Sequence, residues 1–143
     1  MTRRGGTRKH KKSGALSFQQ EITVFFLEKL LMIKLYHWKT TSYAEHKATD
    51  DLYAKLNSNI DTFIEILLGK TETRTSFPRN SSIPLMDVGG KEALRREIDL
   101  FKTYLIDLND HPALKSMANT DLYNLRDTIL GDLNQFLYLL TFQ

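Results

Sequence analysis

The chain has 143 residues, of which 41% are apolar and 26% charged, and a net charge of +3 at pH 7, which suits one globular domain with a single hydrophobic core. The absence of cysteine excludes disulfides, thiolate zinc sites, iron–sulfur clusters and thiol nucleophiles. No apolar run approaches the roughly 20 residues of a membrane span and no secretory signal is evident, so we expect a soluble intracellular protein without membrane contact.

Positive charge is concentrated at the N-terminus. Residues 1–14 contain six basic side chains and no acidic one, whereas the rest of the chain has 14 Lys and Arg against 17 Asp and Glu. A short basic segment with glycines cannot bury enough apolar surface to order itself, so we predict a disordered tail over residues 1–16. Such a tail can bind nucleic-acid phosphates without reading the base sequence. The alternatives are a solubilising tail and a localisation signal. The predicted nucleic-acid-binding residues are Arg3, Arg4, Arg8, Lys9, Lys11 and Lys12.

A first helix is predicted over residues 18–39. Ser17 with Gln20 forms a capping box, in which two side chains reciprocally cap the N-terminus of a helix. The apolar positions then recur at steps of four, four, three and four, which is the period of one helix face. That face consists of Ile22, Phe26, Leu30, Ile33 and His37.

A second helix is predicted over residues 43–69. Ser42 with Glu45 forms a second capping box, and Gly69 is a stop signal at the other end. Its apolar face consists of Leu52, Leu56, Ile60, Phe63 and Leu67. Residues 70–88 contain two prolines among Ser, Thr and Asn, and are predicted to form a connection long enough to cross the length of a bundle.

Two further helices complete the predicted fold, one over residues 90–109 and one from about residue 120. Four helices with short first and last connections and a long middle crossover predict an all-α domain over residues 17–143, a ferritin-like four-helix bundle.

Four polar side chains of the second helix share a face away from its apolar one. With His46 at 0°, Asp50 falls at about 40°, Asp61 at about 60° and Glu65 at about 100°. Histidine and carboxylate side chains are ligands for transition metals such as iron, although a solvated charged surface is the alternative. Asp50 and Asp61 are about 16 Å apart along the helix, too far to share one ion. Two antiparallel copies of this helix would bring His46 and Asp50 of one chain against Asp61 and Glu65 of the other, so the pattern predicts an isologous dimer.

These residues resemble the Dps-like mini-ferritins, the DNA-protecting proteins of starved cells. The resemblance lies in the His-Trp pair at 37–38, His-x3-Asp at 46–50 and Asp-x3-Glu at 61–65, and the segment at 131–140 looks like the closing helix of that family. It covers nearly the whole chain. The segment between the first two histidines is shorter than in the family and lacks its Gly-containing turn. In its basic tail and in its divergence from the family pattern, the chain also resembles proteins encoded by large DNA viruses.

The resemblance implies a ferroxidase site at a dimer interface, which binds iron and oxidises Fe(II), preferentially with hydrogen peroxide, for storage in a dodecameric shell. Asp61 and Glu65 of one copy would bind iron together with His37, His46 and Asp50 of the other. Trp38 would lie beside the site, with a packing aromatic as the alternative. The basic tail matches the tails with which some members bind DNA. The family implies a cytoplasmic or nucleoid location, and a viral source implies association with the virion.

The alternative function is non-enzymatic. A nucleic-acid-binding architectural or packaging protein would keep the bundle and the basic tail without productive iron chemistry.

Overall fold

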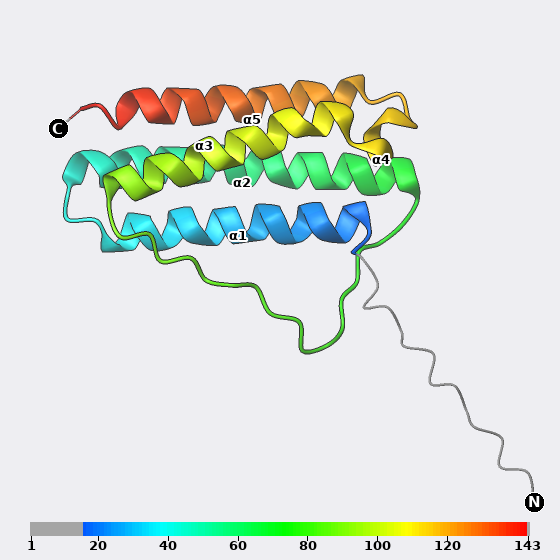
Figure 1. The fold of residues 1–143 in the computed structure, drawn as a ribbon, viewed down its shortest axis with the longest axis horizontal. Coiled ribbons are helices and arrows are strands. Elements are labelled where there is room, and N and C mark those ends of the chain that lie inside the picture. The colour runs from blue at the N-terminus through cyan, green and yellow to red at the C-terminus, as the bar shows by residue number, and fades with distance from the viewer. Residues whose placement is uncertain (1–15, 143) are drawn as a thin grey trace, which may run out of the picture.

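The computed structural model describes residues 16–142, and over this range the chain is all-α, as predicted (Figure 1). The long helices are α1 Phe18–Lys39, α2 Tyr43–Thr71, α3 Lys91–Asp107 and α5 Thr120–Leu139. Two short segments between α3 and α5 are the 3-10 helix η1 Leu108–Asp110 and α4 Pro112–Lys115. The six basic residues of the predicted tail lie outside the described residues, so the tail stays a prediction.

The capping box at α1 is confirmed, with both of its hydrogen bonds present. At α2 only one of the two is present. At α1, the Gln20 N–H donates to Ser17 Oγ at 3.2 Å and the Ser17 N–H donates to Gln20 Oε1 at 3.0 Å. At α2, the Glu45 N–H donates to Ser42 Oγ at 3.2 Å. The Glu45 carboxylate, however, accepts a hydrogen bond from the Tyr36 hydroxyl instead of capping the backbone.

The end of α2 lies beyond the predicted stop at Gly69. The helix continues to Thr71, and Glu72 then takes a left-handed conformation with φ of 52° and donates its N–H to the Leu68 carbonyl. Glycine inside a helix costs only about 1 kcal/mol relative to alanine. Beyond Gly69, the Lys70 ammonium lies 3.0 Å from an Asp121 carboxylate oxygen at the start of α5, so the last turn of α2 contacts the next long helix.

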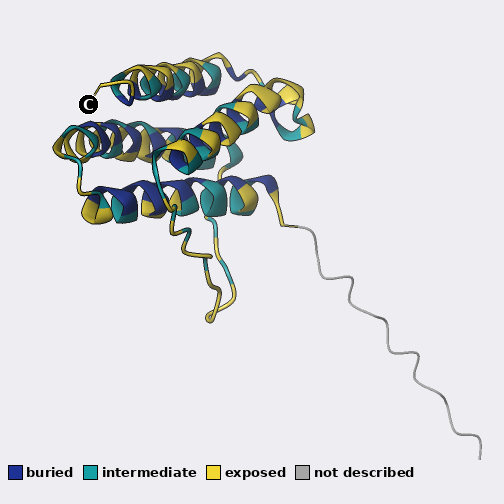
Figure 2. Cartoon of the chain, turned by 60° about the vertical axis from the view of Figure 1, so that its left-hand side comes forward, coloured by how far each residue is buried: buried dark blue, intermediate teal, exposed yellow. Residues whose placement is uncertain are grey.

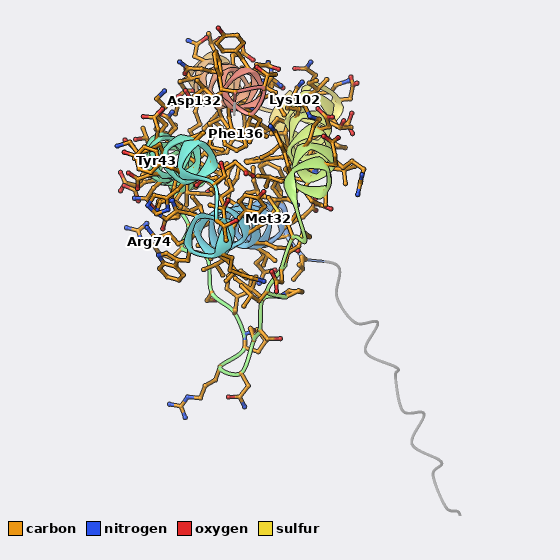
Figure 3. The ribbon with its side chains drawn as sticks, turned by 90° about the vertical axis from the view of Figure 1, so that its left-hand side faces the viewer. Met32, Tyr43, Arg74, Lys102, Asp132 and Phe136 are labelled. Carbon is orange, nitrogen blue, oxygen red and sulfur yellow. The ribbon has the colours of Figure 1, made fainter. Side chains whose placement is uncertain are left out.

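The four long helices lie side by side around one core. α1 and α2 run antiparallel, α3 runs in the direction of α2, and α5 runs opposite to both (Figure 1). α1 packs beside α2, and α5 packs beside both α2 and α3. The buried faces point inward in Figure 2, and in the end view of Figure 3 Met32 and Phe136 lie inside while Tyr43 lies outside. No helix in the described range is long and apolar enough to cross a membrane.

The connection between α2 and α3 runs along α1 and is attached near both ends of that helix. Near the start of α1, Gln20 Nε2 donates to the Ser76 carbonyl at 2.9 Å. At its end, the Lys39 ammonium lies 2.5 Å from an Asp87 carboxylate oxygen. Between these attachments the connection projects away from the helices (Figures 1 and 3). The connection therefore allows α3 to run in the same direction as α2, and its projecting part forms a protrusion beside α1.

Candidate metal centre

His37 at the end of α1 and His46 at the start of α2 bind each other's backbone. His37 Nδ1 lies 2.9 Å from the His46 carbonyl oxygen, and His46 Nδ1 lies 3.0 Å from the His37 carbonyl oxygen. The two rings stack with centroids 4.0 Å apart and an angle of 16° between their planes. We call these two residues the histidine pair. Because a carbonyl oxygen only accepts, each Nδ1 carries a proton, and in the neutral ring each Nε2 has a free electron pair.

Thr49 supports the same proton arrangement from one turn further along α2. Its side chain is fully buried, and Oγ1 lies 3.1 Å from His37 Nδ1. The Thr49 hydroxyl donates to the Glu45 carbonyl at 2.7 Å, so its oxygen is free to accept from His37. Metal-binding histidines commonly donate the second ring N–H in this way, which orients the ring and selects the nitrogen that binds.

Asp50 brings a carboxylate to this arrangement. Its Oδ1 lies 3.9 Å from His37 Nε2. Two ligand atoms that each lie about 2.1 Å from one ion are at most about 4.2 Å apart, so this separation allows both to bind the same ion. The His37 side chain is 9% exposed and that of Asp50 is 65% exposed, so the carboxylate side of the arrangement is open to solvent. We call His37, His46 and Asp50 the histidine half-site.

Asp61 and Glu65, which we call the carboxylate half-site, lie one turn apart and exposed on α2. Asp61 borders a groove of about 210 Å³ between α1 and α2, together with Leu27 and Asn57. Within the described residues of one chain, no three His, Asp or Glu side chains come close enough together to hold a metal ion. A complete site built from the predicted ligands therefore requires a second copy of the chain.

Trp38 follows the buried His37 but points away from the core. It is 69% exposed, so the chain does not use it as a packing aromatic within one copy. The Lys34 ammonium lies 5.7 Å from the Trp38 ring centroid and 4.5 Å from that of Tyr53. A cation and an exposed indole thus stand beside the histidine half-site.

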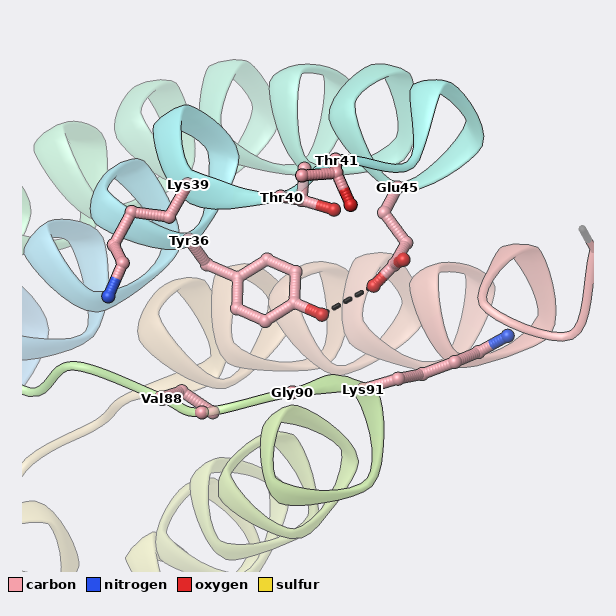
Figure 4. Close-up of a pocket in the computed structure, with 9 residues that line it drawn as sticks. Tyr36, Lys39, Thr40, Thr41, Glu45, Val88, Gly90 and Lys91 are labelled. Atoms are coloured by element: carbon pink, nitrogen blue, oxygen red, sulfur yellow. Dashed lines mark hydrogen bonds between the residues drawn. The ribbon is translucent and has the colours of Figure 1, made fainter.

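Sequence reasoning missed Thr49 and Tyr36, which link the end of α1 to the start of α2. Thr49 contacts His37, and Tyr36 donates to Glu45. Thr49 carries a weak signal, since it stands three residues after His46 and therefore on the same side of the helix. Tyr36 carries none, because Glu45 is an ordinary capping residue in the sequence. The Tyr36 hydroxyl meets Glu45 at the wall of a pocket of about 300 Å³ that none of the predicted metal ligands lines (Figure 4). Burial, the hydrogen bond to Glu45 and its charge raise the pKa of Tyr36 well above its usual value.

Residues 37–140, which include the histidine pair, both half-sites, α3 and α5, match a family described as a family of unknown function (DUF5856). No curated protein matches the chain. No solved structure matches it either.

Proposed function

The chain belongs to the DUF5856 family of unknown function, and we propose that it is an iron-oxidising protein with a ferritin-like bundle, whose metal sites are completed by two copies of the chain. The order and directions of the long helices and the long connection along α1 support the ferritin-like assignment, since such bundles need one crossover of this kind (Figure 1). The cargo and substrate is Fe(II).

The histidine pair is the observation that carries the proposal. A structural role would be met by a hydrogen bond from either nitrogen of each ring, whereas metal binding through Nε2 requires that Nδ1 carry the proton. Here both rings donate from Nδ1 to a carbonyl, which leaves both Nε2 atoms as ligands, and a carboxylate oxygen lies 3.9 Å from one of them. Histidine and carboxylate are the ligands of many non-haem Fe(II) sites. Because no three such side chains come close enough together in the described residues of one chain, we propose that a second copy supplies the remaining ligands.

The spacing on α2 supports completion by a second copy. Two ligand pairs on α2 share one midpoint, which falls between positions 55 and 56. The pairs are His46 with Glu65 and Asp50 with Asp61. A two-fold axis that is perpendicular to α2 and passes beside the helix at that level brings both pairs together at once. Each dimer then has two equivalent sites, each made of one histidine half-site and one carboxylate half-site.

The proposed reaction takes two Fe(II) ions and one hydrogen peroxide. Each Fe(II) loses one electron, the O–O bond breaks, and two protons are taken up, which gives two Fe(III) and two water molecules. The protein supplies positioned ligands and negative charge, which favour the ferric product. For the tail at residues 1–14, we propose a salt-sensitive nucleic-acid tether, supported by its six basic residues and lack of acids.

A mixing experiment tests the shared site. One variant carries His46→Ala with Asp50→Asn, and the other carries Asp61→Asn with Glu65→Gln. Each alone is expected to lose peroxide-dependent iron oxidation, followed by ferric absorbance in a stopped-flow instrument. After subunit exchange at equal amounts, half of the dimers pair unlike chains and each of these has one intact site of two. The mixture should therefore recover about a quarter of the wild-type rate.

The matched control is Glu92→Gln with Asp107→Asn, which removes two exposed carboxylates from α3 and should leave the rate unchanged. The shared site would be contradicted if the wild-type activity depends on all five ligands and the mixture of the two variants recovers no iron oxidation. An unchanged rate in every variant would refute the ferroxidase and favour the non-enzymatic packaging protein.

A further inference from the structure

A stripe of exposed apolar side chains runs along the outer face of α1. Leu27 is 43% exposed, Leu31 44% and Trp38 69%. Steps of four and seven residues place all three within about 40° of one another around the helix. Contiguous exposed apolar side chains mark a surface that another molecule covers.

A groove opens beside the first half of this stripe. Val24 and Leu27 of α1 form one wall, and Phe77, Pro78 and Ile83 of the connection form the other. The groove has a volume of about 710 Å³, and its lining is mostly apolar. We call residues 77–83 the arm, because the connection projects there beyond α1 (Figure 3). Leu27 also borders the groove that contains Asp61, so the face continues from α2 across α1 to the arm.

Contacts between α1 and α2 give the height of each α1 residue along the bundle. His37 lies against Thr49, so Trp38 stands at about the height of Thr49. Leu27 and Asp61 line the same groove, so Leu27 stands at about the height of the carboxylate half-site. The two-fold axis that joins the half-sites passes beside α2 at the level of positions 55 and 56, and it carries the height of Thr49 onto that of residue 62. Trp38 of one copy thus arrives at the height of Val24 and Leu27 of the other.

We propose that the groove between α1 and the arm is the seat for Trp38 of a second copy of this chain. The inference rests on the proposed shared site, which fixes the axis, and adds a contact that the metal ligands do not require. The groove suits Trp38 because both are apolar. Trp38 is a large aromatic and the most exposed side chain of the stripe, and the groove that lies at the height to which the two-fold axis carries it has a mostly apolar lining. Since each copy has one Trp38 and one groove, the two contacts form together and close the dimer.

Trp38 is the only tryptophan in the chain, so its fluorescence reports its own environment. The experiment measures emission and acrylamide quenching of the full-length, metal-free protein over a concentration series, with the oligomeric state followed by sedimentation. Two variants accompany the wild type. Ile83→Ala removes part of the groove wall. Leu85→Ala is the matched control, because Leu85 is 63% exposed in the same connection and does not line the groove.

We expect the wild-type emission to move to shorter wavelength, and quenching to fall, as dimers form. Ile83→Ala should raise the dimer dissociation constant about tenfold and shift the dimer emission back toward longer wavelength, as truncations around a buried aromatic anchor do. Leu85→Ala should behave like the wild type.

A wild-type dimer in which Trp38 stays as quenchable as in the monomer would overturn the seat. So would an Ile83→Ala protein with wild-type emission and affinity. In either case, recovery of activity in the mixing experiment would still support the shared metal site, so the two proposals fail separately. A protein that stays monomeric and shows no recovery would overturn both.

Discussion

Replacing Tyr104 by Phe is expected to stabilise the protein, although the residue lies in its interior. The Tyr104 ring stacks on Phe25 with centroids 3.6 Å apart, which helps to fill the space between α1 and α3. The hydroxyl oxygen is buried and has no hydrogen-bond partner among the described residues. Burial, and then the negative charge of Glu21, raise the pKa of this hydroxyl above its usual value.

The magnitude follows from what each hydroxyl contacts. A buried polar group without a partner costs about 1–3 kcal/mol, and Phe keeps the stacked ring, so Tyr104→Phe should raise the free energy of unfolding by about 1 kcal/mol. Tyr36→Phe is the matched contrast, since it removes the same atom from a hydroxyl that donates to the Glu45 carboxylate. That hydrogen bond borders an open pocket, so its loss should cost about 1 kcal/mol. The two variants should therefore differ by about 2 kcal/mol.

Urea unfolding of each variant, followed by circular dichroism and extrapolated linearly to water, measures both changes. Thermal unfolding provides a second reading, with a shift of roughly 2–4 °C for each kcal/mol in a chain of this size. A loss of stability in Tyr104→Phe equal to that in Tyr36→Phe would refute the reasoning, because it would mean that the Tyr104 hydroxyl makes a favourable contact.

Three further predictions concern the helices and the tyrosines. Gly131→Ala should stabilise the protein by about 0.5–1 kcal/mol in a thermal melt, because Gly131 lies inside α5 and an added Cβ meets no atom within 4 Å; a lower melting temperature would contradict this. Ser17→Ala should cost about 1 kcal/mol through loss of the α1 cap, and urea unfolding that matches the wild type would show that the capping box contributes nothing. The folded-state pKa values of Tyr36 and Tyr104 are raised, so the folded state holds these protons more tightly than the unfolded state, and the free energy of unfolding falls as pH rises from about 10, the unfolded value, through the folded pKa. Unfolding free energies measured from pH 9 to 12 should therefore fall with pH, and should fall less in the double Phe variant; equal slopes would exclude these two tyrosines as the cause.

The sequence predicted most of the helices because their signals are local. Ser17 and the apolar steps that follow it gave the bounds of α1, and the same steps placed His37 on the buried face, where it lies. The angles around α2 predicted that His46, Asp50 and Asp61 point away from the core, and all three are exposed. A side chain's direction relative to its own helix follows from the period of 3.6 residues, which needs no knowledge of other elements.

Only the tertiary structure decided which partner each polar group takes. Glu45 has the sequence of a capping residue, yet its carboxylate meets Tyr36 across the turn between α1 and α2. The reciprocal bonds of the histidine pair likewise depend on how that turn brings two helix ends together. Each such choice is between hydrogen bonds of similar net strength, about 1 kcal/mol apiece, so the packing of the helices selects the outcome and a local pattern does not. The same holds for the arm, whose seat beside α1 exists only because the connection is attached near both ends of that helix.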